Sequence, residues 1–363
     1  MGGNVPSRLA SSIDGAKRYL LEQAADGFPE ARHTMRFPRQ AGFTAASEEQ
    51  STDVFTRAVL ASVLLDAAER DDDVPFRDAI QALAHREAEY VAAARLHHRA
   101  GGWSYFPGLP ELPPDLDSLS AALLLFARAA PERTDLCAEP VALALGNARP
   151  DGSIATWLIS PRDDPADRRL MELGVSRFWG DGSDVDVCAH FYFALWTLDR
   201  ERYGEVARRG ARHVEEKQLS EGSWDATWYH GRAYGTALCL RLLRAVGTGE
   251  GAVSRAADFL SRAENPDPQE TALALWAAAI SGRELPEPSR QRAVAGLLDR
   301  QTGEGHWPAS PWIKMDVGRA AGVKGRILTY GSATLTTAFC LRTLLEIQRG
   351  GRGGERRGRG EQT

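Results

Sequence analysis

Six stretches of the chain share one pattern of polar and apolar positions. Each has a polar or aromatic turn, then a small residue, then an apolar run long enough for a helix. The apolar residues continue almost all the way round each predicted helix, which is typical of helices that are buried on most faces. A unit that recurs in this way indicates a repeat architecture. The six copies begin at Thr52, Leu116, Val185, Ala233, Gln269 and Tyr330.

Amphipathic segments rich in Arg, Glu and Ala lie between these copies, for example YGEVARRGARHVEEKQL and VSRAADFLSRAEN. Their polar faces predict outer, solvent-facing helices. Each unit is then one outer and one inner helix, and six units predict a closed all-α ring, an (α/α)6 toroid, over residues 1–348. β-branched runs with period-two alternation are nearly absent, so no sheet is expected. The Gly/Arg-rich residues 349–363 cannot bury apolar area and are expected to form a disordered tail.

A Gly followed closely by Trp marks the turns of the predicted ring. It occurs in AGGWSYF, EGSWDATW and GEGHWPASPW, and in a degenerate form in PDGSIATW. Gln218 and Gln301 precede two of these turns. Gly permits the tight turn after an outer helix, and the Trp indole N–H can donate to a backbone or Gln acceptor. These residues are expected to join neighbouring units.

Gln with Gly-x-Trp on a helical ring resembles the repeats of squalene–hopene and oxidosqualene cyclases. The stretch GGWSYFPGLPELPPDLDSLSAALLLF resembles that family's acid segment, in which GGW precedes DxDD and a buried helix. SDVDVCAHFYFALW resembles its DVTAH segment, and EGSWDATWYHGRAYGTA follows its DGSW…W…YGT pattern without a gap. Order and approximate spacing agree over residues 80–250, and the rest matches through the repeat only. The resemblance implies a class II terpene cyclase.

Asp115 and Asp117 lie at the mouth of an almost wholly apolar predicted helix. Desolvation and like charge raise the pKa of at least one carboxyl in such a pair. A protonated carboxyl in an apolar cavity is what protonation of an alkene or epoxide requires, and a hydrogen-bond donor on its other oxygen stabilises the carboxylate that remains. The resemblance implies that Asp117 is the proton donor, Asp115 its neighbour, and His190 and Asp186 the supporting groups.

Simpler roles remain open for these residues. A carboxylate at the start of a helix is usually an N-cap or a partner of the helix dipole. Asp53, Asp117 and Asp186 all occupy that place in their repeats. His190 lies on an apolar face, where a histidine is by default part of the core.

Aromatic residues gather near the predicted turns. In a cyclase their faces would stabilise carbocations by cation–π attraction, and otherwise they would form core. The candidates are Trp103, Tyr105, Phe106, Phe178, Trp179, Trp228, Tyr234, Trp312 and Tyr330. A second group, of basic residues, could hold a diphosphate, with Mg²⁺ accompanying it, or could be solvated surface. These residues are Arg232, Lys314, Arg319, Lys324 and Arg326.

The chain departs from the family pattern in two ways. DxDD is here DLDS, with Ser118 in place of the last Asp. The family's site usually lies between two helical domains, whereas this chain is predicted to form one. Loops, a second copy of the chain or a partner domain must then close the cavity.

Composition excludes several other classes of protein. The net charge of the 363 residues is -5, and no aromatic RNA-binding motif lies among basic residues, so no nucleic-acid partner is expected. The longest apolar runs are about half a membrane span and predict buried helices, not transmembrane segments. The N-terminus has no apolar signal region. None of the four cysteines forms a CxxC pair, which favours buried free thiols and a cytoplasmic location.

Three functions follow from these observations. The first is protonation-initiated cyclisation of a prenyl diphosphate or a polyene, with no tightly bound cofactor. The second is a non-catalytic ring that binds an isoprenoid or a protein partner. The third is a zinc enzyme like the prenyltransferases, with Asp186, Cys188 and His190 as ligands. Cys and His two residues apart point to different faces of a helix, so no metal site is expected.

Overall fold

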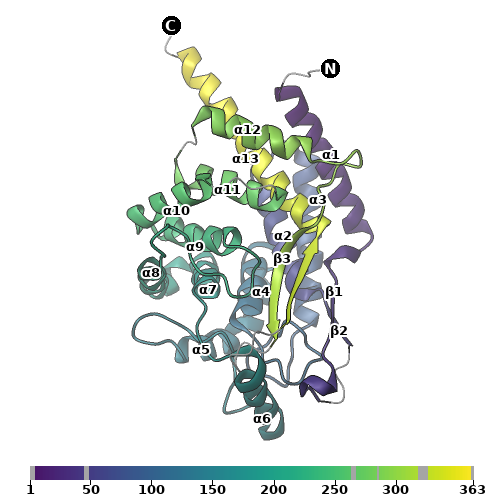
Figure 1. Ribbon diagram of the computed structural model, residues 1–363, viewed down its shortest axis with the longest axis vertical. Coiled ribbons are helices and arrows are strands. Elements are labelled where there is room, and N and C mark those ends of the chain that lie inside the picture. Colours follow the sequence, from purple (N-terminus) through teal and green to yellow (C-terminus); the bar gives the residue numbers. More distant parts are fainter. Residues whose placement is uncertain (1–4, 45–48, 263–266, 284–285, 318–325, 361–363) are drawn as a thin grey trace.

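The computed structural model describes residues 5–44, 49–262, 267–283, 286–317 and 326–360. It confirms the predicted all-α toroid: helices make up most of the described part (Figure 1), and they pack as an inner ring inside an outer one. No described helix is both long and apolar enough to cross a membrane.

The inner ring consists of the six helices that the apolar pattern predicted. Each packs on the next along the chain, and the last packs on the first, which closes the ring. These helices are apolar on nearly all sides because they are buried on most faces, as the sequence indicated. Each faces its neighbours and the axis of the ring. They are α2 (Val54–Ala68), α4 (Leu116–Ala129), α7 (Val185–Leu198), α9 (Ala233–Val246), α11 (Pro268–Ser281) and α13 (Ala333–Gly360).

The outer ring covers the inner one, and its ends also meet, because α1 packs on both α12 and α13. Its helices bury a single face: in α8, Ala207, Ala211 and Val214 are fully buried between charged residues. The outer helices are α1 (Val5–Ala25), α3 (Val74–Ala93), α5 (Ala138–Gly146), α8 (Arg200–Glu216), α10 (Glu250–Arg262) and α12 (Glu287–Asp299). Shorter pieces in the connections are α6 (Pro165–Gly174), a π turn (Val175–Trp179) and 3-10 turns at Pro29–Ala31, Arg39–Ala41 and Pro131–Cys137.

Gln and Trp side chains join neighbouring units, as the Gly-Trp turns indicated. Gln301 Nε2 donates to the carbonyl oxygen of Ser12 on α1 at 2.9 Å, which ties the last unit to the first. Trp307 Nε1 donates to the carbonyl oxygen of Leu297 on α12 at 2.7 Å. The equivalent pair two units earlier along the chain is Gln218 and Trp224.

Two short antiparallel ribbons are present where no strand was expected. β1 (His33–Arg36) pairs with β2 (Glu49–Thr52), and β3 (Ser310–Val317) pairs with β4 (Arg326–Ser332). The prediction was wrong here because β3 does not alternate regularly between buried and exposed residues, so it lacks the period-two signal. Backbone hydrogen bonds join β3 to the loop that precedes α9 (Lys314 N–H to the Trp228 oxygen, 2.8 Å). The β3–β4 ribbon therefore lies against the end of the ring where the inner helices begin.

Helix α13 continues to Gly360, past the domain boundary that the sequence predicts at residue 348. That boundary, and the disorder predicted for residues 349–363, stay predictions.

Candidate active site

Asp117 lies in the first turn of α4, and each of its oxygens has a partner from another unit of the ring. Oδ1 is 2.6 Å from Nδ1 of His190, in the second turn of α7. Oδ2 accepts a hydrogen bond from the hydroxyl of Tyr229, in the loop before α9. The Asp117 residue is only 7% exposed. Three successive inner helices therefore bring their N-terminal ends together around one buried carboxyl group, and these ends favour negative charge.

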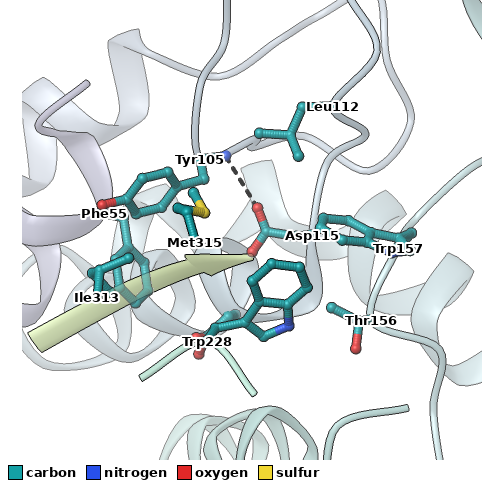
Figure 2. A pocket seen from close by; sticks show the side chains of 10 residues that line it. Phe55, Tyr105, Leu112, Asp115, Thr156, Trp157, Trp228, Ile313 and Met315 are labelled. Atoms are coloured by element: carbon teal, nitrogen blue, oxygen red, sulfur yellow. Dashed lines mark hydrogen bonds between the residues drawn. The ribbon is translucent and has the colours of Figure 1, made fainter. Parts of the chain in front are cut away.

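Asp115, not Asp117, caps α4. Asp115 Oδ1 accepts a hydrogen bond from the Ser118 N–H at 2.7 Å, and Oδ2 accepts one from the Ser118 hydroxyl at 2.8 Å. Oδ2 also accepts a hydrogen bond from the Tyr105 N–H at 3.1 Å (Figure 2). The alternative that Asp117 caps the helix is not supported, because α4 begins two residues earlier than that role requires. Since Asp115 satisfies the helix end, Asp117 is available for another role. Ser118, which departs from the family pattern, holds Asp115.

The capping role expected for Asp53 and Asp186 is also wrong. Asp53 does precede α2, but its side chain makes no capping bond and instead accepts from the Tyr90 hydroxyl at 2.7 Å. Asp186 is the second residue of α7 and lies inside its first turn, as Asp117 does in α4. Residues at this position project toward the centre of the ring.

Two carboxyl groups beside Asp117 hold protons more tightly than usual. Burial and, less strongly, the charge of Asp117 raise the pKa of Asp115 from 3.8 to about 7, although the hydrogen bonds from Ser118 lower it. Burial, with the charges of Asp184 and Asp117, raises the pKa of Asp186 well above its ordinary value. The inference that a carboxyl in this group is shifted upward is thus confirmed.

Asp184, which the sequence did not single out, orders the loops around the site. Its Oδ2 accepts from the Thr156 hydroxyl and the Trp228 indole N–H, each at 2.8 Å. Asp186 is different: Oδ1 accepts from the Val187 N–H at 3.0 Å, and Oδ2 has no hydrogen-bond partner among the described residues. Asp184 thus holds the loop that carries Trp228, whereas Asp186 places a carboxyl oxygen in the interior.

A cavity opens beside Asp115 and Asp117 and contains about 450 Å³ of empty space, part of it open to solvent. Aromatic rings surround the acidic end, and β3 supplies an aliphatic wall (Figure 2). Its lining consists of Phe55, Tyr105, Leu112, Asp115, Asp117, Thr156, Trp157, Trp228, Ile313 and Met315. The chain's own β3–β4 ribbon therefore forms part of the cavity wall.

Of the predicted aromatic contacts, only Tyr105 and Trp228 line this cavity among the described residues. Trp103 and Trp179 are buried side chains that join separate segments of the chain. Their indole N–H groups donate to the carbonyl oxygens of Val91 (2.8 Å) and Glu111 (2.9 Å). For these two side chains the structure supports the core role that the sequence left open.

The remaining predicted aromatics support the lining from behind. Trp312 stacks on Phe55 with ring centroids 5.6 Å apart, and Tyr234 packs on Tyr229 at 4.4 Å. The other three predicted aromatic rings do not line this cavity and pack against aromatic residues near the N-terminus. Tyr330 stacks on His33, Phe106 packs against Phe37, and Phe178 packs against Phe43.

Arg232 and Lys314, the two members of the predicted basic cluster whose side chains are described, do not line the cavity. Arg232 pairs with Glu221 and Asp225 at the surface, and Lys314 Nζ donates to the carbonyl oxygen of Ala226 at 3.0 Å. Arg319, Lys324 and the side chain of Arg326 lie outside the described residues. None of the described residues that line the cavity is basic.

The Asp, Cys and His weighed as zinc ligands do not converge. His190 Nδ1 contacts Asp117, and Cys188 Sγ donates to the carbonyl oxygen of Ile154 at 3.5 Å. Within the described ranges, the one group of three potential ligands is His85, Glu89 and Glu132, away from the cavity. The geometry gives no support to a zinc site formed by Asp186, Cys188 and His190.

Tyr229 is the main site residue that the sequence analysis missed. It lies inside the EGSWDATWYHGRAYGTA segment, directly after Trp228. The segment's match to the family pattern draws attention to its Trp and YGT positions, whereas the hydrogen bond of Tyr229 becomes visible only when α4 and the loop before α9 are placed side by side.

Residues 52–270 match the family model of the squalene-hopene cyclase C-terminal domain. The chain belongs to this family. No curated protein sequence matches it. Among solved structures, this chain is similar to the type II terpene cyclase MstE from Scytonema, with 20% sequence identity and a TM-score of 0.66. The match covers 94% of this chain and 98% of MstE.

Two further structures show how widely the fold is shared. The ent-copalyl diphosphate synthase from Streptomyces platensis is 20% identical over 83% of this chain and 51% of its own length, with a TM-score of 0.53. A possible member of the GH105 family from Klebsiella pneumoniae is 12% identical over 95% of this chain and 93% of that one, with a TM-score of 0.55. The fold alone does not decide the chemistry, which must be argued from the site.

Proposed function

We propose that this member of the family is a protonation-initiated (class II) isoprenoid cyclase in which Asp117 is the proton donor. The observation that carries the proposal is a buried carboxyl that lines an aromatic cavity and is held at both oxygens, by His190 and Tyr229. Each carboxyl oxygen has two lone-pair positions, so one hydrogen bond per oxygen leaves room for a proton directed at a substrate.

The reaction begins when Asp117 transfers its proton to one carbon of a terminal alkene. The alkene's π electrons form the new C–H bond, and a carbocation is left on the neighbouring carbon. Further double bonds attack it in turn, and the last cation loses a proton or captures water. Hydrogen bonds from Tyr229 and His190 stabilise the Asp117 carboxylate that remains, and this lowers the barrier to transfer.

The cavity wall supports the carbocations. The rings of Phe55, Tyr105, Trp157 and Trp228 line the space next to the acid. An aromatic face attracts a cation, more strongly where water is excluded. Asp115 adds an acidic group that is largely neutral below about pH 7, so it does not oppose ionisation of Asp117 in that range.

The substrate class is an isoprenoid whose reacting end is apolar. A structure of an MstE variant is described as a complex with geranylgeranyl dihydroxybenzoate, its substrate. In the present chain the absence of basic side chains from the described lining favours a neutral polyene chain next to Asp117. A diphosphate, and any Mg²⁺ that accompanied it, would lie beyond that lining.

The test is product analysis by mass spectrometry after incubation with a panel of prenyl diphosphates and neutral prenylated compounds. Asp117→Asn retains the size of the side chain but cannot supply the proton, so product formation should fall by roughly 10²–10⁴. Asp199→Asn is the matched control, because Asp199 caps α8 away from the cavity and Asn also caps well. It should leave turnover unchanged.

Melting temperatures of both variants show whether they fold. A folded Asp117→Asn protein with near-full turnover would exclude Asp117 as the donor. Wild-type protein that binds the panel compounds but converts none of them would instead favour the non-catalytic ring.

A further inference from the structure

A second cavity lies along the axis of the ring, on the other side of His190 from the first. All six inner helices line it, and it contains about 420 Å³ of empty space, part of it open to solvent. His190 of α7 and Tyr234 of α9 border it at the acidic end, and Arg241 of α9 and Arg342 of α13 also line it. Most of the remaining lining is aliphatic or aromatic, from residues such as Val59.

Hydrogen-bond donors line this axial cavity without partners. Nε and Nη2 of Arg342, Nε1 of Trp276 and Oγ of Ser62 are all buried and make no hydrogen bond to any described residue. The Arg342 guanidinium lies 3.8 Å from the centre of the Trp276 ring, so these donors come from adjoining groups. Proteins rarely leave buried polar groups unsatisfied, and a cluster of such groups on one cavity indicates a ligand.

The charges around the cavity do not balance. Asp66 contacts Arg128 at 2.8 Å, Arg241 at 2.9 Å and Arg342 at 3.5 Å. Arg70 completes the group and pairs with Glu346, while Glu69 pairs with Arg128. Within this group of ion pairs, four guanidinium groups therefore meet three carboxylates, which leaves one positive charge at the arginine end of the cavity.

This charge persists at neutral pH. Burial lowers the pKa of Arg342 to about 10, so the guanidinium remains protonated. Burial opposes ionisation of Asp66, but Arg241, Arg128 and Arg342 together lower its pKa to about 2. Both groups are thus ionised across the physiological range.

Helix dipoles stabilise part of the positive charge, because Arg128 lies in the last turn of α4, but they do not reach the donors that line the cavity. The C-terminal end of a helix attracts cations only within its last turn. Ser62 lies six residues before the end of α2, and Trp276 lies five residues before the end of α11. Arg342 is in the interior of the long helix α13.

We propose that the axial cavity binds a small monovalent anion of the halide type, held by Arg342, Trp276 and Ser62. Arg and Trp side chains donate hydrogen bonds and accept none, so an anion can satisfy all of them, whereas one water can accept only two hydrogen bonds. A single negative charge neutralises the excess. The anion joins α2, α11 and α13 inside the ring, and this role does not depend on the cyclase activity.

The test measures thermal unfolding of the full chain in sodium chloride and in sodium gluconate at equal ionic strength, because gluconate is too large for the site. Chloride should raise the melting temperature to a plateau, as binding to the native state requires. Trp276→Phe retains the ring that packs on Arg342 but removes one donor. The chloride dissociation constant from the titration should then rise at least about tenfold.

Trp224→Phe is the matched control. It removes an indole N–H that donates to the carbonyl oxygen of Val214 at 2.6 Å, outside the cavity lining. It should lower the melting temperature but leave the chloride dependence unchanged. In crystals grown with bromide, an anomalous peak should lie beside Arg342 and Trp276.

Three results would overturn the proposal. These are a melting temperature equal in chloride and gluconate, an equal loss of chloride dependence in both Trp variants, and crystals without a bromide peak in the cavity. Stabilisation by acetate or pyrophosphate but not by chloride would also exclude the halide assignment.

Discussion

At the scale of single residues, the site depends on which carboxyl group caps α4. Asp115 makes the capping bonds, and Asp117, two residues later, is left to contact His190 and Tyr229. The DLDS motif could be recognised from the sequence. The division of roles within it could not be derived from spacing, because it depends on a difference of two residues in where the helix starts.

The contact with Tyr229 predicts a moderate effect on turnover. Tyr229→Phe removes one hydrogen bond to the Asp117 carboxylate and preserves the ring packed on Tyr234. A hydrogen bond to a charged group contributes about 1.5–3 kcal/mol, so kcat should fall by roughly 10–100-fold. Tyr192→Phe, which loses a hydroxyl bond to the Gly152 carbonyl elsewhere, is the control and should leave kcat unchanged. Equal effects of the two variants on kcat would argue against a role for Tyr229 at the acid.

The raised pKa of Asp115 predicts how stability depends on pH. Its ordinary value is 3.8 and its value in the folded protein is about 7, so the native state binds more protons than the unfolded state between these values. The contribution of Asp115 to stability is therefore complete below about pH 3.8 and is lost as the pH rises through 7. The slope from one such group is at most about 1.4 kcal/mol per pH unit.

Denaturant unfolding from pH 4 to 8 should thus show a steeper fall in the free energy of unfolding for the wild type than for Asp115→Asn. Asp186 remains in both proteins, so its own raised pKa cancels in the comparison. Parallel curves would mean that Asp115 is ionised in the native state throughout.

At the scale of helices and strands, the sequence succeeded where burial is uniform. The inner helices are apolar all round because each packs on two neighbours in the inner ring and on the outer ring. The apolar runs in the sequence reflect this burial directly. The β3–β4 ribbon was missed for the opposite reason. Ile313 and Met315 face the cavity, but their strand has mixed burial and carries only a weak periodic signal.

The bond between Gln301 and α1 predicts a specific loss of stability. Gln301→Leu removes two donated hydrogen bonds and leaves the Ser12 and Gly305 carbonyl oxygens without this partner. The free energy of unfolding should fall by about 1–3 kcal/mol. Gln291→Leu, on the exposed face of α12, is the control and should change it by less than about 0.5 kcal/mol. Equal losses would show that the contact does not hold the ring closed.

At the scale of the whole molecule, ring closure determines what the site can be. The residues around Asp117 come from α4, α7 and the loop before α9, and the cavity wall comes from β3, close to the C-terminal end of the chain. The family segments predicted Asp117 and His190 from the sequence. Tyr229, Asp184 and the ribbon wall could not be predicted, because their contacts join units that are far apart in sequence.

The same long-range packing explains why Arg232, a member of the predicted basic cluster, does not line the cavity. Arg232 lies in the matched family segment, yet in the folded chain it pairs with Glu221 at the surface. The four arginines grouped around Asp66 and Glu346 come from the turn after α2 and from α4, α9 and α13, so no stretch of sequence shows that they meet.

The most direct test of the account is a reaction in D₂O with an isoprenoid that the protein converts. Asp117 exchanges its proton with solvent, so initiation by protonation should place one deuterium on the carbon that was the alkene terminus. Mass spectrometry and NMR of the product would detect it there, and Asp117→Asn should yield almost no product. A cyclised product without deuterium at that carbon would show that protonation does not start the reaction.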